Sequence, residues 1–387
     1  MFKKDYLVSI IIFLLCLTTA SSVSTAAISI SMALGTGVVL YYVYKERRLG
    51  ITEIPSMLLI AMFVFACCML ISSALVGDAN SLHLGEKHIF WLVYFIVAYF
   101  LGRKCNNNLV VMPALLVAVL GLALPAIESF VNTGKRAQGI FSNPNYLAFM
   151  FDITLPWCTV FCVKFWCEAE KRWIKVCTAI IVVIGYFGLY TTGSRGAVLG
   201  VAVSLLLVYG FAKLKTKAIA ISLAVIIFTG VLAVVGPSLL KGRVVSRRYD
   251  NERVLLMESS YAMWKEHKLF GVGLANWNEE YRNKYILADA KQPKLPHSHN
   301  IYTQSFATTG LVGGIPFVLM LLAMLVVLGQ NTGVAGGYYT YAMLGTLIAF
   351  LIHGFFDVLT ISWVMKAFYP LLGITMAEIV KDKNRVV

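Results

Sequence analysis

Charged residues are scarce in this chain: they make up 13% of its 387 residues, whereas hydrophobic residues make up 59%. Ordinary soluble domains carry about 25% charged residues, so a single soluble core could not hide this much apolar surface. Three kinds of motif are also missing: a phosphate-binding P-loop, a dinucleotide-type glycine fingerprint, and an Asp-x-Asp pair in the segments expected outside the cytoplasm. Their absence weakly disfavours nucleotide-driven chemistry and chemistry with an obligatory metal.

Acidic residues are outnumbered, 19 against 33 Lys and Arg, which leaves a formal net charge of +14. In a soluble protein this charge would suggest a nucleic-acid partner. Here the basic residues lie in short clusters between apolar runs of roughly 17 to 22 residues, and such runs match the ~20 residues that a helix needs to cross the hydrocarbon core of a bilayer. The sequence therefore predicts membrane lipids, and no nucleic acid, as the surroundings of the chain.

A disulfide framework is not expected either. The chain has eight cysteines, nearly all of them within or beside apolar runs, and the one long polar segment has none. We interpret them as packing residues rather than as disulfides or a zinc site.

The hydrophobic runs predict an all-α, polytopic integral membrane protein with about twelve transmembrane helices and one large extracytoplasmic loop. The expected helices lie near residues 6–23, 25–44, 56–76, 88–102, 109–130, 145–163, 174–191, 196–212, 217–236, 303–329, 335–354 and 359–379. The first nine helices thus occupy residues 1–236, a periplasmic loop occupies 237–302, and three helices with a cytoplasmic tail occupy 303–387. Within the loop, residues 251–268 place Val254 and Tyr261 at helical spacing, which predicts an amphipathic helix that Gly271 and Gly273 end.

Clusters of Lys and Arg predict the orientation, because cytoplasmic loops retain positive charge. Lys3 and Lys4, before the first expected helix, fall on the same side as Lys381, Lys383 and Arg385, after the last one, and as most of the basic short loops. We expect that side to be the cytoplasm, with both termini in it. The long basic loop on the opposite side does not contradict this orientation, because long segments translocate largely regardless of their charge.

Cations and hydrogen-bond donors gather in four of the segments expected outside the cytoplasm. The first is KRAQGIFSNPNYLA, which begins at residue 135. Arg136 could meet a phosphate, while Asn143 and Asn145 belong to a turn that leads into the next helix. The alternative is an ordinary loop whose Asn145 caps that helix.

Two further arginines suit an anionic ligand. Arg195 lies in TTGSRGA between two apolar helices, where an arginine is costly unless it reaches water, lipid headgroups or a bound anion. Its place on the side with fewer cations favours a function over simple snorkelling. Arg253 lies in the long loop, and its guanidinium could form paired, charge-assisted hydrogen bonds with a pyrophosphate. The alternative is a basic surface that faces anionic headgroups, which we prefer for Arg247 and Arg248.

Two histidines precede the next expected helix, in the segment LPHSHNIYTQSFATTGLVGG. His297 and His299 could suggest a metal site. However, their spacing does not place both on one helical face, and no cysteine or carboxylate cluster completes a ligand set. No metal ligand is therefore assigned, and from spacing alone such a pair is more often structural than catalytic.

Together these segments resemble the O-antigen ligase and polymerase superfamily, integral membrane enzymes that use polyprenyl-pyrophosphate-linked glycans on the periplasmic face. The resemblance covers residues 130–370 and is one of pattern. Its most specific element is a ligase-type signature of His-Asn, nine residues and Gly-x-x-Gly, which here begins at His299-Asn300 and ends at Gly313. TTGSRGA, GIFSNPNYLA and the stretch that begins at Arg253 resemble other recurring elements of the family.

The resemblance implies a site in the bacterial inner membrane that faces the periplasm. His299 aligns with the proposed catalytic histidine, and Arg195 and Arg253 align with arginines thought to engage the pyrophosphate. The candidate substrate-binding residues are Arg136, Asn143, Asn145, His297, Asn300 and Tyr302.

The resemblance also implies a reaction without cofactor or metal. An acceptor sugar hydroxyl attacks the anomeric carbon of the glycan and expels undecaprenyl pyrophosphate, while His299 accepts the proton. The donor is an undecaprenyl-pyrophosphate-linked glycan. The acceptor is lipid A–core for a ligase, which the signature modestly favours, or a growing glycan for a polymerase.

A protein of another class, a transporter or flippase for the lipid-linked glycan, would place ionisable residues along a route through the membrane midplane. The candidates are Glu128, Asp152, His353 and Asp357. Each lies close to the end of an expected helix or has a packing explanation, so the sequence favours the enzyme over the transporter.

Overall fold

The structure is a computed structural model that describes residues 2–47, 50–211, 248–332, 337–358, 360 and 362–386. The described residues form helices joined by short loops. The α-helices are α1 (Phe2–Ser21), α2 (Thr25–Glu46), α3 (Ser56–Val76), α4 (Ala79–Lys104), α5 (Val111–Thr133), α6 (Pro144–Glu168), α7 (Arg172–Thr191), α8 (Arg195–Phe211), α10 (Arg248–Glu266), α11 (Trp277–Glu280), α12 (Ile301–Gln330), α13 (Tyr338–His353) and α14 (Ser362–Val386).

Within the described part of the chain, eight helices are long and apolar enough to cross a membrane, which confirms an all-α, multi-pass membrane protein. They are α2 to α7, α12 and α14, and the apolar stretches at Tyr6–Ser21 in α1, Arg195–Tyr209 in α8 and Tyr338–His353 in α13 are shorter. The expected helix at 217–236 lies outside the described residues, as do Arg247 and the start of the long loop. The expected number of twelve spans is therefore not confirmed.

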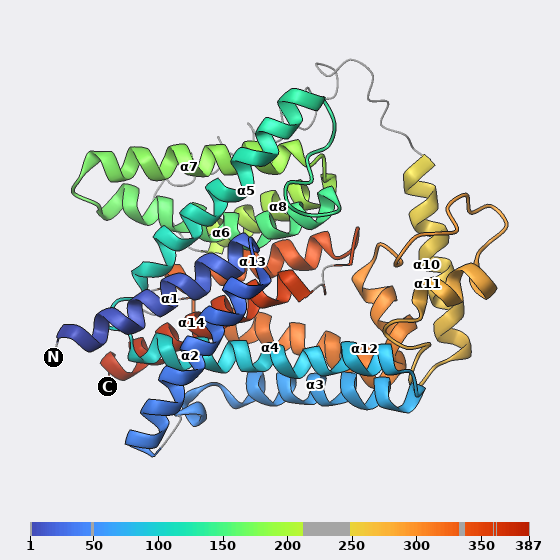
Figure 1. Ribbon diagram of the computed structural model, residues 1–387, viewed down its shortest axis with the longest axis horizontal. Helices are drawn as coiled ribbons and strands as arrows, with labels where there is room; N and C mark the ends of the chain where they lie inside the picture. Colours follow the sequence, from blue (N-terminus) through green and yellow to red (C-terminus); the bar gives the residue numbers. More distant parts are fainter. Residues whose placement is uncertain are drawn as a thin grey trace.

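The helices α1, α5, α7, α8, α13 and α14 pack around α6, whose residues 147–163 are all buried. The helix α13 packs against α6 and α8, while α14 packs along α4 and α12 packs along α3. Both ends of the chain lie at one end of this bundle, and α10 and α11 lie at the opposite end (Figure 1).

The helix expected at 251–268 is present as α10, Arg248–Glu266. However, the face on which it packs differs from the one expected, because Val254 and Tyr261 are exposed. Leu256 and Met263 are buried instead, in a small core with Trp277 and aromatic residues of the following turn. Val254 and Leu256 lie two residues apart and therefore on different faces of the helix, so the sequence did not show which of them would be buried. Packing against α12 buries the face that carries Leu256.

The long loop is held to α12 where that helix is interrupted. Gly310 has a φ of +62°, so α12 bends there, and residues 268–273 cross the bend. Val272 N and Gly273 N donate to carbonyl oxygens of α12, and Leu311 N donates to Lys268 O. A Cβ atom on Gly310 would lie 2.3 Å from the carbonyl carbon of Leu269. The crossing is therefore close enough that only glycine fits.

We expect Gly310→Ala to destabilise the protein, with Gly134→Ala as the matched control. Gly134 has a φ of +64° but nothing within 4 Å of a new Cβ atom, so alanine there carries only the left-handed backbone penalty of ~1–2 kcal/mol. At Gly310 the contact with the Leu269 backbone adds an overpacking penalty of ~1–3 kcal/mol. Melting temperatures in detergent measure the difference, and equal losses for the two variants would contradict this account of the crossing.

Candidate functional site

A cavity of about 370 Å³ lies where the start of α6, the turn between α7 and α8, α10, and the loop before α12 meet. Its lining includes all three residues that the sequence predicts as catalytic and three of the six predicted for substrate binding: Arg136, Asn143, Asn145, Arg195, Arg253 and His299. These residues come from four segments that are far apart in the chain, and folding brings them to one place.

The other three predicted binding residues, His297, Asn300 and Tyr302, are not in the lining of this cavity. The Asn300 side chain caps α12 by accepting hydrogen bonds from Tyr302 N at 3.0 Å and Thr303 N at 2.9 Å. The Tyr302 hydroxyl donates to Leu351 O at 2.8 Å. Both residues therefore help to fix the segment that carries His299.

Three arginines make the cavity suitable for an anion. Arg195 is the first residue of α8, so the positive end of that helix adds to its charge. Arg253 lies near the start of α10, and among the described residues its guanidinium has no ion pair. Glu252 also lines the cavity but forms no ion pair with Arg253; its Oε1 accepts from Lys291 N and Gln292 N, both at 2.9 Å.

A chain of hydrogen bonds connects the third arginine to the histidine. Arg136 Nη2 donates to Asn145 Oδ1 at 2.6 Å, and its Nε donates to Thr192 O at 2.7 Å. Asn145 Nδ2 then donates to Asp357 Oδ2, whose other oxygen, Oδ1, lies 3.1 Å from His299 Nδ1. The alternative role expected for Asn145 was wrong: Asn143 caps α6, accepting from Asn145 N at 2.8 Å. The side chain of Asn145 is thereby free to bridge Arg136 and Asp357.

Asp357 is the main site residue that the sequence reasoning did not assign. Its side chain is 2% exposed and lies in the turn after α13, 58 residues from His299. Burial alone would raise the pKa of this carboxyl group, but the hydrogen bond from His299 and the nearby histidine charges outweigh burial and hold its pKa below the usual range. The one signal in the sequence was an aspartate directly after an apolar helix, which we interpreted as a transport-route candidate.

The ionised carboxylate determines which ring nitrogen of His299 carries the proton. A carboxylate can only accept hydrogen bonds, so Nδ1 of His299 is the donor, and in the neutral ring Nε2 carries the lone pair. The residue is held in a left-handed conformation, with a φ of +52°. Next to it, Ile301 N donates to Gly354 O at 2.8 Å, which ties the loop to the turn after α13.

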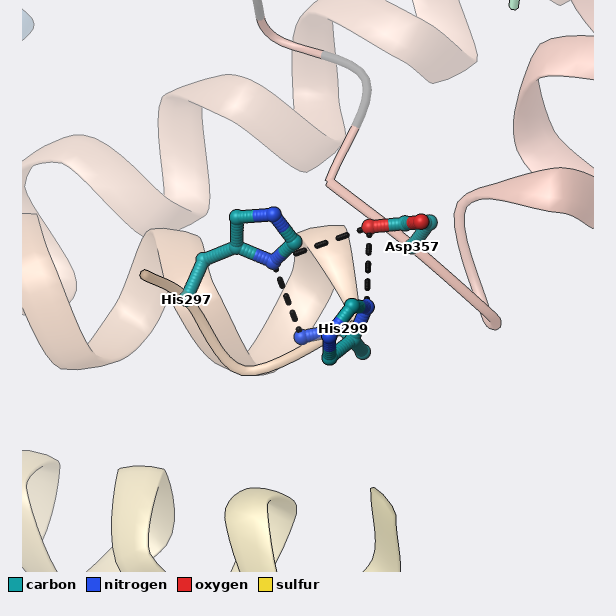
Figure 2. Close-up of side chains that lie close together, drawn as sticks. All are labelled: His297, His299 and Asp357. Carbon is teal, nitrogen blue, oxygen red and sulfur yellow. Dashed lines mark hydrogen bonds and ion pairs between the residues drawn. The ribbon is translucent and has the colours of Figure 1, made fainter. Parts of the chain in front are cut away.

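His297 lies beside this pair (Figure 2). Its Nδ1 accepts a hydrogen bond from His299 N at 3.3 Å and lies 3.6 Å from Asp357 Oδ1. Burial lowers the pKa of His297 to about 4, against the opposing effect of the Asp357 charge. His297 is therefore neutral near pH 7, with its lone pair on Nδ1. Spacing along the sequence offered no carboxylate to this histidine pair, but the fold supplies one, and the side-chain ligand atoms of the three residues lie within 4.8 Å of one another.

The remaining transport-route candidates do not form a series across the described helices. His353 Nδ1 lies 2.5 Å from Asp152 Oδ2, and its Nε2 lies 3.3 Å from the Ser194 hydroxyl oxygen. His353 and Ser194 belong to the lining of the same cavity as Arg195. Glu128 is separate and exposed on α5.

A second cavity of about 550 Å³ lies on the other side of the His299 segment, among α3, α4, α12 and α14. Ile301 and Val358 line it, whereas His299 and Phe356 line the first cavity, so the same two stretches of chain form the wall between the cavities. Lys87 and Lys366 lie in the second cavity with aromatic residues, and within the described part of the chain neither lysine has an ion pair.

Residues 180–318 match a family model described as O-antigen ligase. Arg195, Arg253 and His299 fall inside the match, whereas Arg136, Asn145 and Asp357 fall outside it. No curated protein matches the chain.

We expect nitrogen NMR of selectively labelled histidine to show the two protonation patterns. His297 should remain neutral from pH 8 down to pH 5, with its proton on Nε2, because its pKa is lowered to about 4. In its neutral form His299 should carry its proton on Nδ1, because Asp357 accepts a hydrogen bond there. The variants His297→Gln and His299→Gln assign the signals, and free histidine, with a pKa of about 6.5, serves as the control. A His297 signal that titrates like free histidine would contradict the burial that we describe.

Proposed function

We propose that this protein, whose residues 180–318 carry the O-antigen ligase domain shared by ligases and polymerases, transfers a glycan from undecaprenyl pyrophosphate to a sugar hydroxyl. The reaction takes place at the cavity lined by Arg195, Arg253 and His299. The observation that carries this proposal is the convergence of an anion-binding group and a base on one cavity.

The arginines bind the pyrophosphate and stabilise the charge that grows on it as it leaves. Arg195 and Arg253 approach from opposite elements, α8 and α10, and planar guanidinium groups match phosphate oxygens in pairs. Arg136 is held in place by Thr192 and Asn145, so it contributes a positive charge at a fixed position.

His299 is the general base. The acceptor oxygen forms a bond to the anomeric carbon, the bond from that carbon to the phosphate oxygen breaks, and its electron pair leaves with the pyrophosphate. The acceptor proton passes to Nε2 of His299, and Asp357 stabilises the resulting imidazolium through Nδ1. The glycosyl phosphate bond supplies the driving force, so the reaction needs neither nucleotide nor metal.

The acceptor is an amphipathic molecule with anionic groups, and we favour lipid A–core, which makes the protein a ligase. The second cavity suits an acceptor with anionic groups and a lipid tail, since it combines Lys87 and Lys366 with aromatic walls directly behind the His299 segment. The His-Asn-x9-Gly-x-x-Gly signature favours the same activity. Polymerisation of repeat units on the same carrier is the alternative, because the matched domain is common to both activities.

The active site faces the periplasm in this proposal, and both termini lie in the cytoplasm. The arrangement of the chain supports it, because the termini lie at the end of the bundle opposite to α10 (Figure 1). The apolar helices between the two ends allow the polyprenyl tail to enter from the bilayer.

We expect His299→Gln to reduce transfer in proteoliposomes by ~10²–10⁴-fold, the usual contribution of a general base. Arg195→Lys and Arg253→Lys should each cost ~10²–10³-fold, because lysine lacks the fork that holds the leaving group. Arg282→Lys, at an exposed position outside the cavity, is the matched control and should stay near the wild-type rate. EDTA should leave the wild-type rate unchanged. Protein that binds the donor but forms no product with any acceptor would contradict an enzyme and favour transport.

A deletion strain separates ligase from polymerase, since the two activities leave different products. Loss of a ligase should leave finished polymer on its carrier and lipid A–core without glycan on a lipopolysaccharide gel. A single repeat unit on the core would instead identify a polymerase and overturn our preference.

A further inference from the structure

His297, His299 and Asp357 form a compact group of possible metal ligands at the edge of the first cavity (Figure 2). Asp357 Oδ1 lies 3.1 Å from His299 Nδ1 and 3.6 Å from His297 Nδ1. Zinc binds such atoms at about 2.0–2.2 Å in tetrahedral geometry, which separates neighbouring ligand atoms by roughly 3.3–3.5 Å. The two measured distances bracket this separation. The ligand atoms of all three residues lie within 4.8 Å of one another, so the two histidine nitrogens would also have to reach this separation to share an ion.

The electron pairs in this group also favour a cation. His297 Nδ1 accepts a hydrogen bond from His299 N, so this nitrogen carries a lone pair, and it faces an oxygen of an ionised carboxylate 3.6 Å away. Asp357 Oδ1 accepts hydrogen bonds from His299 Nδ1 and Val358 N, but no hydrogen bond joins it to His297 Nδ1, so these two electron-rich atoms repel each other. A cation bound to both of them would turn this repulsion into attraction.

The surroundings resemble the outer shell of a metal site. The three side chains are 12%, 16% and 2% exposed, so little water competes for the ligands. Asn145 Nδ2 donates to Asp357 Oδ2, the carboxylate oxygen that faces away from the histidines. Such hydrogen bonds fix the orientation of a metal-binding carboxylate.

We propose that His297, His299 and Asp357 bind a zinc-class divalent transition-metal ion, and that the bound ion inhibits glycan transfer. Two imidazole nitrogens and one carboxylate oxygen suit zinc rather than magnesium or calcium, which prefer oxygen ligands. The fourth tetrahedral position is left for water. Inhibition rests on the proposed role of His299 as the base, whereas binding does not.

Inhibition follows from the single proton of the neutral His299 ring. In the metal-free protein this proton is on Nδ1, where Asp357 accepts it, and Nε2 is the basic nitrogen. An ion that binds Nδ1 requires the proton to move to Nε2, so the ring can no longer accept a proton from the acceptor hydroxyl. The ion also occupies the carboxylate that would stabilise the imidazolium. Zinc is therefore an inhibitor of this site and not a cofactor.

Zinc binding is measured by calorimetry on the full chain, purified through a streptavidin-binding tag so that no polyhistidine competes, and stripped with EDTA. We expect a single zinc ion per chain. His297→Gln and Asp357→Asn each remove a ligand, and they should weaken binding by more than the ~100-fold that loss of an outer-shell partner can cost. His83→Gln, at an exposed position on α4, is the matched control and should bind as the wild type does.

The same preparations in proteoliposomes measure inhibition. Zinc should slow transfer by the wild type and by His83→Gln, and EDTA should restore the rate, whereas the residual rate of His297→Gln should not respond to zinc. No high-affinity binding to the wild type, or undiminished binding to His297→Gln, would overturn the metal site. Binding without any effect on the rate of transfer would overturn the inhibition. If the wild type catalyses no transfer at all, the proposed function fails, while calorimetry still decides whether the metal site exists.

Discussion

A single buried carboxylate, that of Asp357, holds the centre of this molecule together. It accepts hydrogen bonds from Asn145 at the start of α6, from His299 before α12, and from the amide of Val358 in its own turn. A carboxylate with so little exposure is costly to bury unless its lone pairs are satisfied. These three donors satisfy it, and the requirement places three distant segments of the chain against one another. Because Asn145 also accepts from Arg136, the same group sets the distance between the base and one of the cations.

The general architecture could be predicted from the sequence because bilayer thickness leaves few choices for apolar runs. Most of the expected helices appear near their predicted positions. Among the described residues, the apolar stretches of α1, α8 and α13 are shorter than those of the other membrane helices. These three helices pack against α6, which covers part of each. The length of an apolar run alone therefore does not show whether the helix crosses the membrane by itself. For α10 the helix itself was predicted correctly and its buried face was not, because the pattern in the sequence does not say which neighbour will cover it.

Part of the candidate site could also be predicted from the sequence. Arg195 and His299 stood out because each lies next to an expected membrane helix, and Arg253 because its guanidinium in the long loop suits a pyrophosphate. The fold arranges all three around one cavity. Their catalytic roles stay predictions. Asp357 is separated from His299 by the whole of α12 and α13, and no spacing rule connects two residues so far apart. Asn300 and Tyr302 stood out for their position beside His299, but their side chains fix the local backbone and do not line the cavity.

The interruption of α12 at Gly310 explains why the His-Asn-x9-Gly-x-x-Gly signature has a fixed spacing. The helix starts at the Asn300 cap, and Gly310 must meet the crossing chain at residues 268–273. In a helix each residue turns the chain by about 100° and advances it by about 1.5 Å. The nine residues between Asn300 and Gly310 therefore span a fixed distance and a fixed rotation, because both ends of this interval are held in place. One inserted residue would rotate the glycine away from the chain that it must accommodate, so this interval cannot change length.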